Sequence, residues 1–161
     1  MMSRGEFMRA GGRDVLLSWW RGLERDKGGR AALRRCHTLS EVMLEPSYHA
    51  LCRELHALPE VKWDLERLAA VAALAALVEE WPEGIESLPT QMARKVGDRK
   101  VVSELRFRRV LQCQEPEELF QSLRRIIRLL DKRVDLPDLV AAVHDWGDRT
   151  RKEWAYAYFK S

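Results

Sequence analysis

The sequence has no apolar run long enough to cross a membrane. Its longest uncharged apolar stretch, residues 68–78, spans 11 residues, whereas a membrane-spanning helix needs about 20. The N-terminal segment carries charges where a secretory signal peptide would carry its apolar stretch. These two absences predict a cytoplasmic protein without membrane contact.

Cysteine is scarce, and the cysteines that are present form no recognisable framework. Cys36, Cys52 and Cys113 are odd in number, lie far apart and include no CxxC pair. Structural disulfides need paired cysteines in a compartment that favours oxidation. The sequence therefore predicts reduced thiols in the core.

Catalytic signatures are absent as well. The chain contains no glycine-rich phosphate loop, no nucleophile elbow and no HExxH pair. His49, Cys52 and His56 could face one way on a helix and offer three zinc ligands, but no fourth ligand is evident. A core thiol beside two surface histidines is the favoured interpretation. We therefore predict a protein that is not an enzyme and uses no metal or cofactor.

The residues that are present favour one compact domain with a heavily charged surface. Of 161 residues, 46% are hydrophobic and 33% are charged. The net charge is +5 in residues 1–35, −7 in 36–91, +6 in 92–133 and −1 in 134–161. Separate basic and acidic surfaces could steer a polyanion to one side, although ordinary solvated helix faces would give the same counts.

Apolar residues recur at helical spacing, and no stretch keeps the alternation of a half-buried strand. The predicted fold is all-α, a two-lobed helical bundle of about eight to nine helices. Residues 61–81 are apolar nearly all round in the middle and predict the buried central helix. The Trp81-Pro82-Glu83-Gly84 break predicts an N-terminal sub-bundle (residues 1–84) and a C-terminal one (residues 85–161) in a single compact domain.

Helix boundaries follow from capping residues, prolines and glycines. The first helix is expected at about residues 13–25, with Gly28 and Gly29 ending it. The other expected helices span about residues 30–36, 46–57, 90–96, 103–113, 116–132, 136–146 and 149–159.

Six tryptophans are many for this length and could provide stacking platforms for unpaired bases. Most lie in apolar stripes, which favours core packing for Trp19, Trp20, Trp63, Trp81 and Trp146. For Trp154 and Tyr158 on the last helix, both roles stay open.

The helix predicted over residues 116–132 carries the clearest functional signal. Opposite its apolar face, four basic residues fall within an arc of about 100°: Arg124, Arg125, Arg128 and Lys132. Further basic residues lie upstream: Arg94, Lys95, Arg99, Lys100, Arg106, Arg108 and Arg109. Guanidinium groups bind phosphate bidentately, so this pattern suits a sugar-phosphate backbone. The alternative is a solvated face balanced by neighbouring glutamates.

A helix-turn-helix reader of DNA is a weaker interpretation. Met92, Ala93, Val96 and Gly97 match the first half of that motif. Asp98, Ser103 and Arg106, however, occupy positions that such a motif fills with apolar residues.

Four segments carry a family resemblance through their order and spacing. They are LLSWWRGLERDKGGRAALRRC, then MARKV followed by SELRFRRVL, then SLRRIIRLL, and finally VAAVHDWGDRTRKEWAYAYF. With these segments the chain resembles, over nearly its whole length, the CasB family, the small subunit of the type I-E CRISPR Cascade surveillance complex. The resemblance implies an all-helical protein without enzymatic activity. It also implies as partners guide RNA, target DNA strands, the backbone and large subunits of Cascade, and a second copy of the chain.

The resemblance further implies nucleic-acid contacts at basic positions of the matching motifs. These are Arg34 and Arg35 in AALRRC, Lys62, Arg106 in ELRF, Arg124 and Arg125 in SLRR, and Arg149 and Arg151 in DWGDRTR. Arg99, Arg109 and Arg128 on the basic segments complete the predicted set. Asp148 departs from the family, in which a basic residue can follow that glycine.

The predicted function is non-catalytic stabilisation of the R-loop in antiviral defence, by basic surfaces that hold displaced and paired strands. Replacing Arg124 and Arg125 together by Ala is expected to leave the fold intact and to shorten the R-loop lifetime. The alternative is a helical protein-interaction adaptor without nucleic-acid contact, and an isolated transcriptional regulator is the third candidate.

Overall fold

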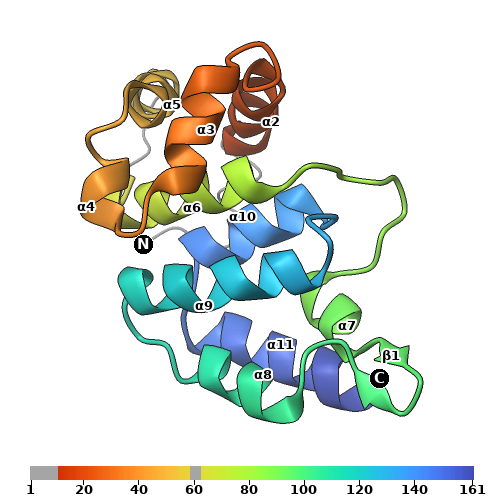
Figure 1. Ribbon diagram of the computed structural model, residues 1–161. Helices are drawn as coiled ribbons and strands as arrows, with labels where there is room; N and C mark the ends of the chain where they lie inside the picture. Colours follow the sequence, from red (N-terminus) through yellow and green to blue (C-terminus); the bar gives the residue numbers. More distant parts are fainter. Residues whose placement is uncertain (1–10, 59–62) are drawn as a thin grey trace.

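The structure is a computed structural model in which residues 11–58 and 63–161 are described. These residues form ten helices and one short hairpin, which confirms the all-α prediction (Figure 1). The helices are α2 (Gly12–Gly22), α3 (Lys27–Arg35), α4 (Leu39–Val42), α5 (Pro46–His56), α6 (Leu65–Leu77), α7 (Leu88–Ala93), α8 (Glu104–Leu111), α9 (Pro116–Leu129), α10 (Leu136–His144) and α11 (Asp148–Lys160). None of them is long and apolar enough to span a membrane.

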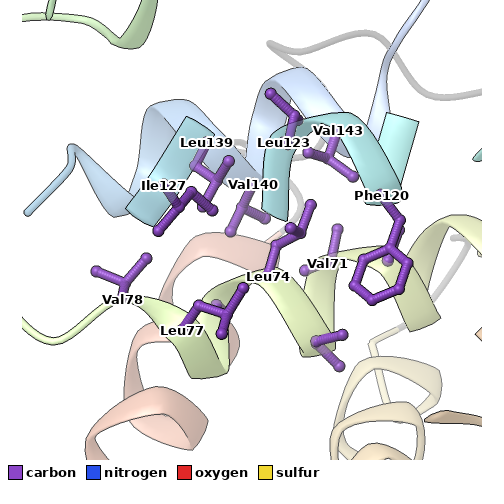
Figure 2. Packing of buried hydrophobic residues seen from close by; sticks show 14 of the residues in the cluster. Val71, Leu74, Leu77, Val78, Phe120, Leu123, Ile127, Leu139, Val140 and Val143 are labelled. Atoms are coloured by element: carbon purple, nitrogen blue, oxygen red, sulfur yellow. The ribbon is translucent and has the colours of Figure 1, made fainter. Parts of the chain in front are cut away.

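Helix α6 is the centre of the molecule. Every residue from Leu68 to Leu77 is buried, and α3, α4 and α5 contact one part of its surface while α9 and α10 contact another (Figure 1). Its alanines let these neighbours approach closely, and Figure 2 shows Val71 and Leu74 among the side chains of α9 and α10. Because α6 is shared by helices before and after residue 84, the division into two sub-bundles at that residue stays a prediction.

The helix expected over residues 61–81 is shorter than predicted. It begins after Asp64, whose side chain accepts a hydrogen bond from the backbone N–H of Arg67, and residues 61–62 lie outside the described part. At the other end, Glu80 pairs with Arg133 in an isolated bridge. Extended backbone after Leu77 therefore replaces the predicted last turn.

Side chains from α2 and α3 hold the C-terminal carbonyls of α6. Trp20 Nε1 donates to the carbonyl of Ala75 at 3.0 Å. Arg30 Nη2 donates to Val78 O at 2.6 Å, and Arg34 Nε donates to Ala76 O at 2.7 Å. Carbonyls in the last turn of a helix have no partner within the helix, so these donors complete its hydrogen bonding. Burial, with the nearby charge of Arg34, lowers the pKa of Arg30.

Two glycines expected to end the first helix lie inside the second. α3 begins at Lys27, and its N-cap Asp26 accepts a hydrogen bond from Gly29 N at 2.9 Å. A Cβ atom at Gly29 would collide with the side chains of Asp26 and Ser47. The glycine therefore permits close approach of α3 to the start of α5, and its role is different from the helix termination that we predicted.

The helix predicted over residues 90–96 ends early and is followed by a hairpin. α7 ends at Ala93, and β1 (Lys95–Val96) pairs with β2 (Arg99–Lys100) in antiparallel fashion. Gly97 in the turn has a φ of 65°, a left-handed conformation that favours glycine. A hairpin at this position is incompatible with a helix-turn-helix motif, so that interpretation is wrong.

The aromatic side chains mostly pack inside, as predicted. Trp19, Trp20, Trp63 and Trp146 are buried, and Trp81 is only partly buried. Trp154 and Tyr158 on the last helix, for which base stacking and core packing were both left open, are buried and pack in the core.

A leucine at the centre of the core should be far more important for stability than a leucine on the surface. Leu74 is fully buried, so Leu74→Ala should lower the free energy of unfolding by about 2–5 kcal/mol. Leu105 is 60% exposed, and Leu105→Ala should change it by less than about 0.5 kcal/mol. Urea denaturation of both variants checks this. Equal losses would contradict the central position of α6.

Candidate nucleic-acid interface

Helix α9 presents three different faces to its surroundings. It begins with Pro116, and Glu118 Oε1 accepts a hydrogen bond from the backbone N–H of Glu115 at 3.2 Å. Leu119, Phe120, Leu123, Ile126 and Ile127 are buried, and this apolar face packs on α6 (Figure 2). The packing fixes the rotation of α9 about its axis and thereby determines where each of its arginines points.

One polar stripe of α9 binds the turn between α3 and α4. Leu39 N donates to Glu117 Oε2 at 3.0 Å, and Gln121 Nε2 donates to the carbonyl of His37. Arg124 Nη2 donates to Arg34 O at 3.3 Å, and its Nη1 lies 3.2 Å from His37 Nδ1. We call Glu117, Gln121 and Arg124 the α9 clasp. It joins α9 to a segment about eighty residues earlier in the chain.

The sequence predicted Arg124 on the exposed cationic face of α9. The structure shows instead that this residue is buried. Only 8% of it is exposed, and burial followed by the nearby Arg128 lowers its pKa. Its donors are engaged by groups of the protein, which leaves it poorly placed to bind phosphate. The spacing of Glu117, Gln121 and Arg124 on one helix face was a signal for the clasp that the sequence interpretation missed.

Six predicted arginines are exposed and form no ion pair with any residue that the structure describes. They are Arg35, Arg99, Arg106, Arg109, Arg125 and Arg128. Arginine is always protonated in proteins and offers donors in a planar fork. These six guanidinium groups are therefore free to bind an anion without first breaking an ion pair.

Four of the six lie on two neighbouring helices. α8 and α9 lie side by side in Figure 1, and Cys113 Sγ, two residues after the end of α8, lies 3.5 Å from Ser122 Oγ on α9. Arg106 and Arg109 are one turn apart on α8, and Arg125 and Arg128 are one turn apart on α9. We call these four residues the α8–α9 arginines.

The remaining two free arginines lie at different distances from this group. Arg35 follows Arg34, whose carbonyl binds Arg124, so Arg35 lies alongside the middle of α9. Arg99 lies on the hairpin strand β2, apart from α9 in Figure 1. Of these two residues, Arg35 is therefore the one that lies near α9.

The other predicted residues have partners within the protein or lie outside the described residues. Arg34 binds the end of α6 and lies 3.7 Å from Glu79. Arg149 Nε lies 3.3 Å from Glu153 Oε1, and Arg151 lies 3.6 Å from Asp148. Asp148, which departs from the family pattern, thus forms an ion pair with Arg151. Lys62 lies outside the described residues.

Lys132 also differs from the prediction. It lies beyond the end of α9, with a φ of 59°, and its Nζ lies 3.4 Å from Glu79 Oε1. The carbonyl of Lys132 accepts a hydrogen bond from Glu79 N at 2.9 Å. This residue therefore belongs to the junction between α9 and the end of α6.

The cysteines are buried free thiols, which confirms the prediction for them. Cys52 is buried while His49 and His56 are exposed, as the favoured interpretation required. Among the described residues, no cluster of His, Cys, Asp and Glu could hold a metal ion. Burial raises the pKa of Cys36, Cys52 and Cys113.

The described residues form a mostly helical protein with exposed arginines on the neighbouring helices α8 and α9. The sequence profile of the CRISPR-associated protein Cse2 family matches residues 29–159, and the chain belongs to this family. That membership confirms the resemblance to the small Cascade subunit. No curated protein matches the chain.

The fold is also similar to one chain in a solved structure. That structure is the crystal structure of E. coli Cascade bound to a PAM-containing dsDNA target with a 32-nt spacer. The match has a TM-score of 0.67, 18% sequence identity, and covers 89% of this chain and 93% of that chain. At this identity the likeness establishes the shared fold.

The raised thiol pKa values predict a loss of stability in alkali. The thiols of the unfolded chain lose their protons at lower pH than the buried thiols of the folded chain do. The free energy of unfolding is therefore at its full value at neutral pH and decreases as pH rises above the ordinary thiol pKa of about 8.5. Urea unfolding should therefore give a lower free energy at pH 9.5 than at pH 7.5. A variant with Cys36, Cys52 and Cys113 replaced by Ala should show a smaller decrease, and an equal decrease would contradict the assignment to thiols.

Arg124 and Arg125 should differ sharply in their effect on stability. Arg124→Ala removes a donor from the α9 clasp and should lower the free energy of unfolding by about 1–3 kcal/mol. Arg125→Ala, on the exposed neighbour, should change it by less than about 0.5 kcal/mol. The replacement of Arg124 and Arg125 together by Ala, which the sequence suggested would leave the fold intact, should therefore lower the free energy of unfolding as well. Similar urea midpoints for the two single variants would refute the clasp.

Proposed function

We propose that this protein is the non-catalytic small subunit of a Cascade-type CRISPR ribonucleoprotein and that it binds nucleic-acid phosphates through the α8–α9 arginines. The observation that carries the proposal is that these four guanidinium groups are exposed, lie on neighbouring helices and form no ion pair with the described residues. Membership of the Cse2 family and the fold shared with a Cascade chain support it.

The chemistry of this surface favours binding over catalysis. Its functional groups are guanidinium ions, which stay protonated and therefore serve neither as nucleophile nor as general base. They bind phosphate oxygens bidentately and carry no sequence information when they do so. Such a surface accepts any guide sequence, as a subunit of a programmable complex must.

Modest contacts to the backbone are enough for R-loop stabilisation. The hybrid of guide RNA and target strand is about as stable as the DNA duplex that it replaces, so protein contacts can shift the balance. By holding the displaced or the paired strand, this subunit opposes re-formation of the duplex. Its partners in this proposal are guide RNA, target DNA, the backbone and large subunits, and a second copy of the chain, all in the cytoplasm.

Removing the α8–α9 arginines should shorten the R-loop lifetime. We expect faster R-loop dissociation when Arg106, Arg109, Arg125 and Arg128 are all replaced by Ala in an assembled complex. For the isolated protein on single-stranded DNA, the slope of log affinity against log salt should become shallower by about 0.7 for each lost phosphate contact. Single-molecule lifetimes and a salt titration measure the two effects.

A matched control loses the same charge elsewhere. Arg13, Arg21, Arg25 and Arg53 are exposed on α2, on α5 and in the turn after α2, and their replacement by Ala should leave the R-loop lifetime unchanged. Equal effects of both quadruple variants would show that only net charge matters and would contradict the assigned surface.

Filter binding separates this proposal from its two rivals. The isolated protein should bind DNA and RNA weakly at low salt and with equal affinity for unrelated sequences. A protein-interaction adaptor would show no appreciable affinity for either nucleic acid. A transcriptional regulator would distinguish one sequence from another.

A further inference from the structure

One side of α11 carries an exposed aromatic ring between basic residues. Tyr156 is 79% exposed and Phe159 is 48% exposed, the only large aromatic side chains so exposed among the described residues. Lys152 lies four residues before Tyr156 and Lys160 four residues after it, and both are exposed. Because residues three or four apart share one face of a helix, these four side chains form a continuous stripe, which we call the α11 stripe.

The opposite side of α11 holds the helix in place. Trp154 is buried against Trp146, with ring centroids 5.1 Å apart. Tyr158 stacks on Phe107 of α8 with centroids 3.9 Å apart and planes 7° apart, and its hydroxyl donates to Val102 O at 2.6 Å. Figure 1 shows α11 beside α8. Tyr156 therefore projects from a fixed support, although the fold buries little of its ring.

The charges around Tyr156 match a nucleic-acid strand. Lys152 and Lys160 form no ion pair with any described residue. Glu153, an acidic residue on this part of α11, is held by Arg149 at 3.3 Å. Four residues of a helix span about 6 Å along its axis. The backbone position of each lysine is therefore displaced by about 6 Å along the axis of α11 from that of Tyr156. A phosphodiester strand can place phosphates at both lysines while its base covers the ring.

We propose that Tyr156 is a stacking site for an unpaired base, with Lys152 and Lys160 binding the phosphates on either side. Stacking requires an unpaired base, and the faces of all bases suit an aromatic ring, so the ligand is single-stranded nucleic acid of any sequence. The inference rests on the proposed function and adds a contact of a different kind, because the α8–α9 arginines offer charge without an exposed aromatic ring.

The test compares a strand with bases and a strand without them. Full-length wild type, Tyr156→Ala and Tyr156→Phe are titrated against a labelled oligothymidine and against an abasic strand of equal length, at low salt. Tyr156→Ala should bind the oligothymidine about 5- to 150-fold more weakly, the range expected for one base–aromatic stack. Tyr156→Phe keeps the ring and should bind within about twofold of wild type. On the abasic strand, all three proteins should bind alike.

The lysines provide the matched control. Replacing Lys152 and Lys160 by Ala should weaken binding to both strands and make the slope against log salt shallower by about 1.4, for two phosphate contacts on a single strand. Tyr156→Ala, which removes no charge, should leave that slope unchanged. Unchanged urea midpoints confirm that the variants are folded.

The outcomes separate this inference from the function on which it rests. If wild type fails to bind the oligothymidine, the proposed function and the inference both fall. If wild type binds and Tyr156→Ala binds equally well, the inference alone is overturned. If Tyr156→Ala keeps its affinity for the strand and instead fails to join the assembled complex, the α11 stripe is a protein contact, which also overturns the inference.

Discussion

The packing of α9 on α6 is the constraint from which the rest of the surface follows. α6 is apolar through its buried middle, so it accepts neighbours on several sides, and its alanines let them come close. Once Phe120, Leu123 and Ile127 are buried against it (Figure 2), α9 cannot rotate. The direction of Arg125 into solvent and that of Arg124 toward the α3–α4 turn are two consequences of the same hydrophobic contact.

Arginine has two distinct tasks in this protein. Arg30 and Arg34 donate to carbonyls at the end of α6, and Arg124 donates to the carbonyl of Arg34. These three side chains donate to backbone acceptors near the ends of helices in a partly buried region. Within residues 11–58 and 63–161, the side chains of the α8–α9 arginines bind no such acceptor. The number of basic residues therefore overestimates the number that can bind a polyanion, because some arginines bind backbone carbonyls within the fold.

The sequence predicts the helices well where a periodic apolar stripe is long, as in α2 and α9. It fails where the deciding partner is distant in the chain. Gly29 resembles a helix stop until Asp26 and Ser47 are seen beside it. Arg124 and Arg125 are adjacent in SLRR, and what distinguishes them is the contact of Arg124 with Arg34 and His37, about ninety residues earlier. Periodicity identifies a face of a helix, but it cannot tell whether that face meets solvent or a polar turn.

The two proposed surfaces differ in the state of the nucleic acid that they suit. Guanidinium groups can bind the backbone of a paired strand or of an unpaired one, because phosphates are exposed in both. An aromatic ring gains stacking energy only from a base that has left its partner. A protein that carries both kinds of surface on one rigid bundle therefore favours the open state of a duplex over the closed one, since the α11 stripe adds binding energy only after the strands separate.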